Sequence, residues 1–406
     1  MAWVGFVIGL LVVIFTVISL VTTFVLPRGG TKFQLLPLQV GRGVRLGFLF
    51  LARPARTFAR KDDLLAAIGP VSLITQLAVF LSLFILGYAL MQWPWTGSFP
   101  GGIRDSAASL FSVGLIHPSA RGNDALVVLA GATGAIAVAL QIGYLPAIYQ
   151  AFNRRESLVT LMESRAGVPA WGPEVLMRHQ LVRITDALPA LYGDWELWAA
   201  DLAESHISYP VLLWFRSPEP GFSWILSLLA VMDAAAMHLS MSPSVAPSEA
   251  RMCLRMGFTA LRRIAQTLHW EFDADPSPEG ELQLTYEDFA YAVELVRDTG
   301  FPVEQTTEEA WRNFRGWRVN YEALAYRMAD RVIAPRAPWS GERRHLPLEL
   351  MLPNRPPHRS PEGKVFYDQK RRPDYIPVAS EPAPFRPVPW HRRHRATDSD
   401  PGQSDL

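Results

Sequence analysis

The chain has 406 residues, 49% of them hydrophobic, and carries a formal net charge of +1. Its single cysteine, Cys253, excludes an internal disulfide framework and a cysteine-based metal cluster, and no basic domain with interleaved aromatic residues points to nucleic acid. The apolar residues gather in a few long blocks, which predicts a membrane protein.

Three uncharged stretches are long enough to cross a bilayer, which takes about 20 apolar residues. They are Trp3 to Leu26, Ile68 to Trp93 and Ala125 to Tyr149. A cleaved signal peptide is an alternative for the first stretch, but it would need a positive n-region and a small-residue cleavage site, and Met1-Ala2-Trp3 carries no basic side chain. We therefore expect a retained membrane anchor.

The loops between these stretches differ in charge. Residues 27–67 hold eight Lys and Arg side chains, whereas residues 94–123 hold only Arg104 and Arg121. The positive-inside rule then predicts an inner-membrane protein with its N-terminus outside and everything after Gln150 in the cytoplasm. Within the basic loop, Gly43 to Ala52 is expected to lie along the membrane surface.

Between the second and third stretches lies Ser106 to Pro118, an apolar segment that is too short to cross. Non-helical backbone at membrane depth survives only where protein or a water-filled cavity surrounds it, since each unpaired group costs several kcal/mol in lipid. The segment therefore predicts a re-entrant loop of an ion pore, completed by other copies of the chain in a homotetramer.

The third stretch is rich in Ala and Gly, which lets neighbouring helices approach closely. One interpretation is a pore-lining inner helix with a hinge at Gly131, Gly134 and Pro146, because Gly permits bending and Pro removes a backbone hydrogen bond. The other is a tightly packed membrane helix, which the small residues support about equally. The adjacent re-entrant segment favours the first interpretation.

A span, a short pore helix, a Ser-Val-Gly turn and a Gly-containing span are together similar to the pore module of potassium channels. More narrowly, the chain resembles a bacterial family of potassium-channel-like proteins of the two-pore-domain type. This resemblance covers about Trp93 to His179. It rests on four runs: Ala139 to Pro146 (ALQIGYLP), Ala151 to Glu156 (AFNRRE), Ser164 to Gly167 (SRAG) and Pro169 to Glu174 (PAWGPE).

The resemblance implies that Ser112, Val113 and Gly114 match the first three positions of the potassium filter TVGYG. Leu115 replaces the Tyr, and Ile116 replaces the second Gly. A β-branched residue resists the left-handed backbone that the filter glycines adopt. The replacement of the second filter Gly by Ile116 implies fewer rings of carbonyl oxygens in the filter and weaker ion selectivity.

The expected function is thus a tetrameric cation channel with weak selectivity, whose partners are monovalent cations (potassium first), the lipid bilayer and further copies of the chain. The alternative is a non-conducting membrane scaffold or receptor that keeps the pore-module fold. An enzyme is not expected, because no catalytic motif stands out, and no cofactor is implied. Asp201, Glu204 and His206 could share a helix face near a metal, although a solvated face is the usual reason for such spacing.

After Glu156 the apolar residues recur at helical spacing up to about Ile333. The segment Phe222 to Ser240 is nearly long enough for a fourth span, but Asp233 and His238 would be costly in lipid. The predicted helices are Glu174 to Tyr192, Asp194 to Ser205, Phe222 to Met241, Ser248 to Leu268, Thr285 to Thr299 and Glu308 to Val332.

The fold class expected from these patterns is an all-α membrane protein with three transmembrane helices, a re-entrant pore loop and a helical cytoplasmic domain. Its parts are an N-terminal helix and basic loop (1–66), a pore module (67–153), the helical domain (154–335) and a Pro/Arg-rich tail (336–406). The composition of the tail cannot bury a core, so we expect it to be disordered.

Overall fold

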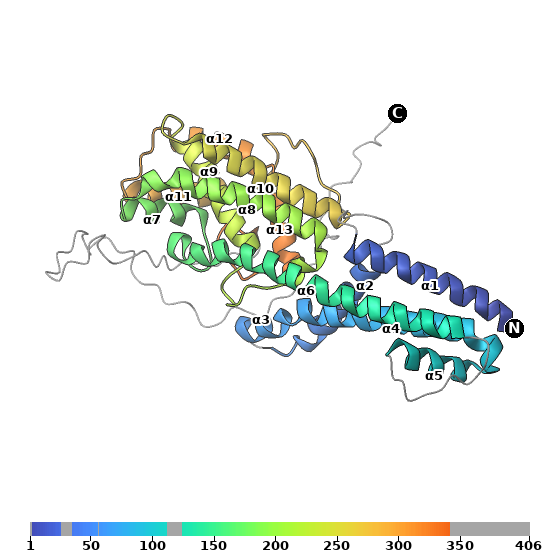
Figure 1. Ribbon diagram of the computed structural model, residues 1–406. Coiled ribbons are helices and arrows are strands. Elements are labelled where there is room, and N and C mark those ends of the chain that lie inside the picture. Colours follow the sequence, from blue (N-terminus) through green and yellow to red (C-terminus); the bar gives the residue numbers. More distant parts are fainter. Residues whose placement is uncertain (1, 26–34, 56, 112–123, 342–406) are drawn as a thin grey trace, which may run out of the picture.

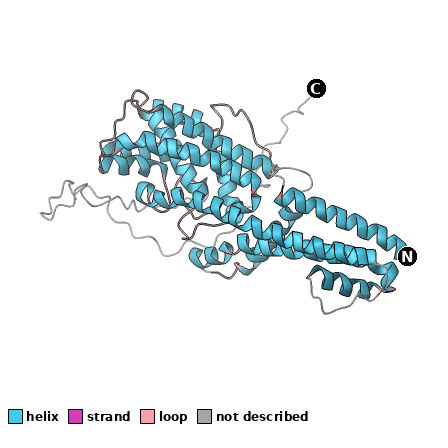
Figure 2. Cartoon of the chain, in the orientation of Figure 1, coloured by secondary structure: helices cyan, strands magenta, loops and turns pink. Residues whose placement is uncertain are grey.

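The computed structural model describes residues 2–25, 35–55, 57–111 and 124–341. Every regular element in these ranges is a helix, as predicted (Figure 2). Four helical segments among them are long and apolar enough to cross a membrane, and several suit a multi-pass membrane protein. They are α1 (Ala2–Phe24), α3 with α4 (Phe58–Thr96), α6 (Asp124–Ala166) and α9 (Trp224–Met241).

Helices α1, α4 (Ile68–Thr96) and α6 run side by side and leave apolar side chains exposed (Figure 1). Ile74 on α4 and Val128 on α6 are 70% and 71% exposed, which suits a surface that faces lipid rather than water. By contrast, every residue of α9 is buried inside the helical domain.

Small residues bring α1 and α4 together. A Cβ atom on Gly9 of α1 would collide with the backbone of Gly87 on α4, so these two backbones touch directly. At one end of the pair, Trp3 and Trp95 meet edge to face with ring centroids 5.6 Å apart. This aromatic cluster is typical of a membrane–water interface.

The basic loop forms two further helices, α2 (Leu35–Leu51) and α3 (Phe58–Ala66). The segment expected along the membrane surface lies mostly in α2, which begins eight residues earlier than predicted. The α3 helix is capped by Thr57, whose side chain accepts a hydrogen bond from the Arg60 amide. Both helices lie at the end of the bundle that adjoins the helical domain (Figure 1).

The helical domain wraps around α9, which packs against six other helices. It buries one large apolar core that includes Trp171, Trp195 and Phe314. Its other elements are α7 (Gly172–Leu181), η2 (Thr185–Ala187), α8 (Leu188–Ser208), η3 (Pro210–Trp214), α10 (Ser248–Thr267), α11 (Tyr286–Asp298), α12 (Thr307–Arg318) and α13 (Glu322–Val332).

Two predicted helices are wrong in their extent. The helix predicted over Glu174 to Tyr192 breaks after Leu181, where Arg183 has a φ of 57°, and α8 starts six residues before Asp194. The helix predicted over Glu308 to Val332 breaks at residues 319–321 between α12 and α13. In both cases tertiary packing overrides a continuous apolar pattern.

The third apolar stretch lies within a longer helix. Beyond Tyr149, α6 continues through Arg154 and Arg155 to Ala166, so one 43-residue helix links the three-helix part to the helical domain. Charged residues end a span but not a helix, because a helix that leaves the bilayer keeps its internal hydrogen bonds.

Candidate pore module

A short helix, α5 (Phe99–Leu110), occupies the position where the sequence predicts a pore helix. It begins seven residues before Ser106, because Gly97 (φ 69°) ends α4 in the left-handed conformation and Ser98 then caps the new helix. The chain therefore reverses at once, and α5 runs back along α4 (Figure 1). A Cβ on Gly102 would meet the Ala89 carbonyl oxygen at 2.5 Å, so the two backbones pack closely.

The C-terminal end of α5 rests on the glycines of α6. A Cβ on Gly134 would lie 2.5 Å from the Leu110 carbonyl oxygen, and one on Gly131 would lie 3.2 Å from that of Ser109. Only glycine at position 134 leaves room for the backbone of α5 there. The C-terminal end of α5 thus packs directly on Gly131 and Gly134 of α6, and we call this contact the seat of α5. The sequence predicts both glycines as hinge residues, and bending of α6 at them stays a prediction.

The side chains around this seat are tightly packed. Leu110 is 4% exposed and belongs to a buried cluster with Phe84 and Tyr88 of α4 and Ala137 of α6. The Tyr88 hydroxyl forms a 2.8 Å hydrogen bond with that of Thr133, which ties α4 directly to α6. The end of α5 is therefore held by both long helices.

The seat of α5 lies about three turns along α6 from the start of that helix. Gly134 is ten residues along α6 from Asp124, which corresponds to about 15 Å at 1.5 Å per residue. A hydrocarbon core is about 30 Å thick. If α6 crosses a bilayer, the C-terminal end of α5 lies near mid-depth.

The interior of the three-helix part also holds polar side chains. The Oγ atoms of Ser72 and Ser106, Nε2 of Gln76 and Oε1 of Gln141 are buried without a hydrogen-bond partner in the described residues. Polar groups inside a membrane bundle are costly and usually mark a function. In the sequence, Gln141, Ser72 and Gln76 carry no signal that separates them from packing residues.

The predicted filter residues Ser112, Val113, Gly114, Leu115 and Ile116 lie outside the described residues. Pro146, the third predicted hinge residue, lies on an exposed side of α6, and the helix continues past it.

Arg155 clamps α6 to the helical domain. Its guanidinium is 2% exposed and donates to the carbonyl oxygens of Leu212 (3.0 Å) and Phe215 (2.7 Å). It also forms an ion pair with Glu156 at 2.7 Å. Burial, and then the charge of Arg155, hold the pKa of His206 well below its usual value, so this neighbour stays neutral.

A second link joins the basic loop to the domain. Arg216 forms an ion pair with Asp62 of α3 and also donates to the carbonyl oxygens of Val332 and Ile333 at the end of α13. The sequence does not predict the buried contacts of Arg155 and Asp62, because nothing in their neighbours along the chain distinguishes a buried charge from a solvated one.

The residues considered for a metal do not converge. Asp201 pairs with Arg154 at 3.1 Å on the surface, while His206 is buried beside Arg155. Within the described ranges, the structure brings together no cluster of His, Cys, Asp and Glu suited to a metal ion.

Searches with family models, among curated proteins and among solved structures find no match to this chain.

Proposed function

We propose that the chain is a homotetrameric cation channel of the potassium-channel-like type, with weak selectivity. In this proposal α1, α4 and α6 cross the membrane, α5 leads a re-entrant segment, and residues 112–116 form the ion path. The N-terminus lies outside and the helical domain in the cytoplasm. The fourth apolar helix, α9, is left out of the spans because it has no surface free for lipid.

The seat of α5 carries the proposal. A helix that follows α4 directly, runs back along it and ends on Gly131 and Gly134 brings its C-terminal end about 15 Å below the start of α6. The C-terminal end of a helix bears a partial negative charge, which favours a cation. Residues 112–116 follow from that point in the chain.

The unpartnered polar side chains support the same function. In hydrocarbon, Gln76 and Gln141 would lose their hydrogen bonds to water with nothing in return. A water-filled path between subunits, or contacts across a subunit interface, would satisfy them. A purely lipid-surrounded single chain would not.

The test is flux of potassium and sodium through the purified chain in liposomes. We expect a tetrameric mass in mild detergent, measurable flux and near abolition of flux in Gly114→Ala, with expression and assembly unchanged. The double change Leu115→Tyr with Ile116→Gly should raise the preference for potassium over sodium.

Gly143→Ala provides the control, because a Cβ at Gly143 meets no atom of the described residues within 4 Å. Unchanged flux in Gly114→Ala would remove residues 112–116 from the ion path. A stable tetramer without flux would favour the non-conducting scaffold, and a stable folded monomer would contradict the pore.

A further inference from the structure

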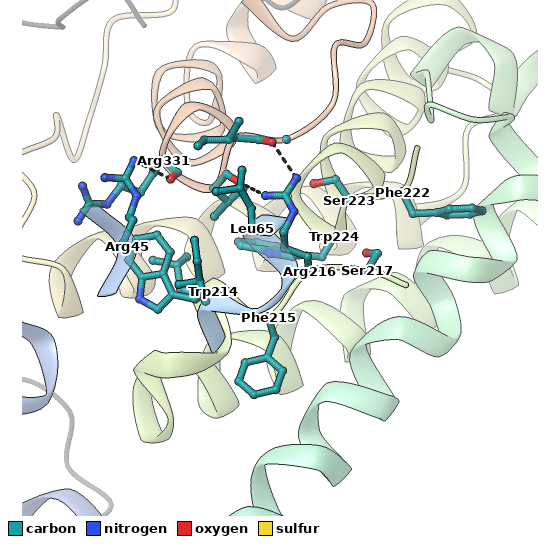
Figure 3. Close-up of a pocket in the computed structure, with 15 residues that line it drawn as sticks. Arg45, Leu65, Trp214, Phe215, Arg216, Ser217, Phe222, Ser223, Trp224 and Arg331 are labelled. Carbon is teal, nitrogen blue, oxygen red and sulfur yellow. Dashed lines mark hydrogen bonds between the residues drawn. The ribbon is translucent and has the colours of Figure 1, made fainter. Parts of the chain in front are cut away.

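A pocket lies where the membrane part meets the helical domain (Figure 3). Its walls come from α2, the start of α4, the segment after η3, the first turn of α9 and the end of α13. The space inside it has a volume of about 20 Å³, room for one water-sized group. A single oxygen of a larger ligand would fill this space.

The first turn of α9 faces this pocket without a cap. Ser223 stands at the N-cap position and lines the pocket, but its side chain makes no capping hydrogen bond, and the first turn contains no acidic residue. The first amides of a helix have no partner within it and carry a partial positive charge. An uncapped helix start inside a pocket is therefore suited to an anion.

Ser217 supplies an independent indication. It lines the same pocket and is 6% exposed, and its Oγ atom has no hydrogen-bond partner among the residues that the structure describes. A buried hydroxyl normally has a partner. Figure 3 shows Ser217 and Ser223 together on one side of Arg216, in line with a shared ligand.

The opposite side of the pocket is positive. The guanidinium groups of Arg45 and Arg331 lie 5.5 and 5.2 Å from the ring of Trp214, and the buried Nε of Arg331 has no hydrogen-bond partner in the described part of the chain. Burial, and then the charge of Arg331, lower the pKa of Arg45 to about 10. Among the residues that the structure describes, no Asp or Glu lines the pocket to offset these charges.

Arg216 already pairs with Asp62 and donates to the carbonyl oxygens at the end of α13. Its guanidinium therefore lines the pocket but is not available to a ligand. Hydrogen-bonding capacity remains on the α9 amides, on the two serine hydroxyls and on the guanidiniums of Arg45 and Arg331, although one Arg45 nitrogen already donates to the Arg331 carbonyl oxygen. All of them favour an oxyanion.

We propose that this pocket binds a phosphate group, either soluble phosphate or the phosphate of an anionic phospholipid headgroup. A phosphate here would connect α2 and α4 to α9 and α13, and so fix the helical domain against the membrane helices. The proposal goes beyond channel function and does not depend on conduction.

The experiment uses the full chain in lipid nanodiscs and follows thermal unfolding. One arm titrates inorganic phosphate into phosphatidylcholine discs at constant ionic strength, and the other adds phosphatidylglycerol to the discs. Stabilisation by phosphate identifies a soluble ligand, whereas stabilisation by phosphatidylglycerol alone identifies a headgroup. Either result supports the site.

The variants decide whether the effect belongs to this pocket. Ser217→Ala should weaken binding about tenfold, and Arg45→Gln with Arg331→Gln by more. Arg53→Gln is the matched control, because it removes a charge from the exposed end of the same basic loop, outside the pocket. It should leave binding unchanged.

Ser217→Ala removes a hydroxyl that has no partner within the described ranges, so the variant should fold as well as the parent. Loss of binding in it is then loss of a ligand contact. The proposal is overturned if neither phosphate nor phosphatidylglycerol stabilises the chain. It is equally overturned if the stabilisation persists in Ser217→Ala and in the double arginine variant.

Discussion

Arg154 and Arg155 are neighbours in the chain with opposite surroundings. The Arg154 side chain is 56% exposed and pairs with Asp201 on the surface, whereas that of Arg155 is 2% exposed and holds two carbonyl oxygens and Glu156. Exposed pairs contribute at most about 1 kcal/mol, because water and salt screen them. Removing one partner of a buried pair costs about 3–5 kcal/mol.

We therefore expect Arg155→Ala to lower the free energy of unfolding by about 3–5 kcal/mol and Arg154→Ala by less than about 1 kcal/mol. Thermal unfolding in detergent measures both. Arg155→Lys keeps the positive charge but loses the planar guanidinium. It should lower the free energy of unfolding by an amount between those of the two alanine variants. Equal effects of the two alanine variants would show that Arg155 is not the clamp between α6 and the domain.

Glu174 makes stability depend on pH. It is 4% exposed, and burial raises its pKa from 4.5 to about 7 although Arg178 opposes the shift. Because the folded-state pKa lies above the unfolded value, the folded chain binds more protons between pH 4.5 and 7. The contribution of protonated Glu174 to the free energy of unfolding is fully present below pH 4.5 and is lost as the pH rises through 7.

Glu174→Gln should remove this dependence. Between pH 4.5 and 7 the parent should lose up to about 3 kcal/mol relative to the variant, at about 1.4 kcal/mol per unit of pKa. Unfolding curves of both proteins across this range give the difference directly. Parallel curves at all pH values would mean that the pKa of Glu174 is the same in the folded and the unfolded chain.

At the scale of elements, Gly134 and Gly143 of α6 form a matched pair. A Cβ at Gly134 would lie 2.5 Å from the Leu110 carbonyl oxygen, whereas one at Gly143 meets nothing within 4 Å in the described part of the chain. Gly134→Ala should push α5 away and cost about 1–3 kcal/mol, as overpacking does. Gly143→Ala should be neutral or slightly stabilising, since it removes a helix-interior glycine.

Thermal unfolding and liposome flux are measured for both variants, Gly134→Ala and Gly143→Ala. If α5 leads the ion path, Gly134→Ala should reduce flux as well as stability. A fully stable Gly134→Ala protein would contradict the close seat of α5 on α6.

The three long apolar helices could be predicted closely, because uncharged stretches of this length have few solutions other than a helix that satisfies its own backbone hydrogen bonds. The start of α4 at Ile68 and the start of α10 at Ser248 agree with the sequence. The breaks inside the helical domain could not be predicted, since they depend on partners far along the chain. The ion pair of Arg318 with Asp233, at 2.5 Å, joins residues 85 positions apart.

Only part of the candidate site could be predicted from the sequence. The position of a short helix before residue 112 follows from the apolar segment between two spans. Its contact with Gly134 does not, because Ala and Gly in the third stretch suit a hinge, a seat and plain packing equally. Ser217 gave no signal at all: a serine in a loop becomes notable only when its hydroxyl is buried without a partner.

At the scale of the whole molecule, the contacts fix which segments share one end. Arg216 binds Asp62, and Arg45 donates to the Arg331 carbonyl oxygen at 3.3 Å, so the basic loop and the helical domain lie together. The turn before α5 lies at the other end of the long helices (Figure 1). A membrane between the two ends would separate them.

Cysteine labelling tests this arrangement, and the native Cys253 does not interfere because it is fully buried. An impermeant maleimide added to intact cells should label Pro100→Cys. It should label Arg53→Cys and Tyr291→Cys only after the cells are opened, because the basic loops favour the cytoplasm. Labelling of Arg53→Cys from outside, without Pro100→Cys, would reverse the proposed orientation.

The comparison of Arg53→Cys with Tyr291→Cys tests the fold separately from the orientation. Tyr291 is 56% exposed and follows α9 in the chain, whereas Arg53 precedes it. If α9 crossed the membrane, the two positions would lie on opposite sides. Because α9 is buried on all sides by its own domain, we expect the two cysteines to react under the same conditions in every experiment. Opposite reactivity would show that the chain crosses the membrane once more between them.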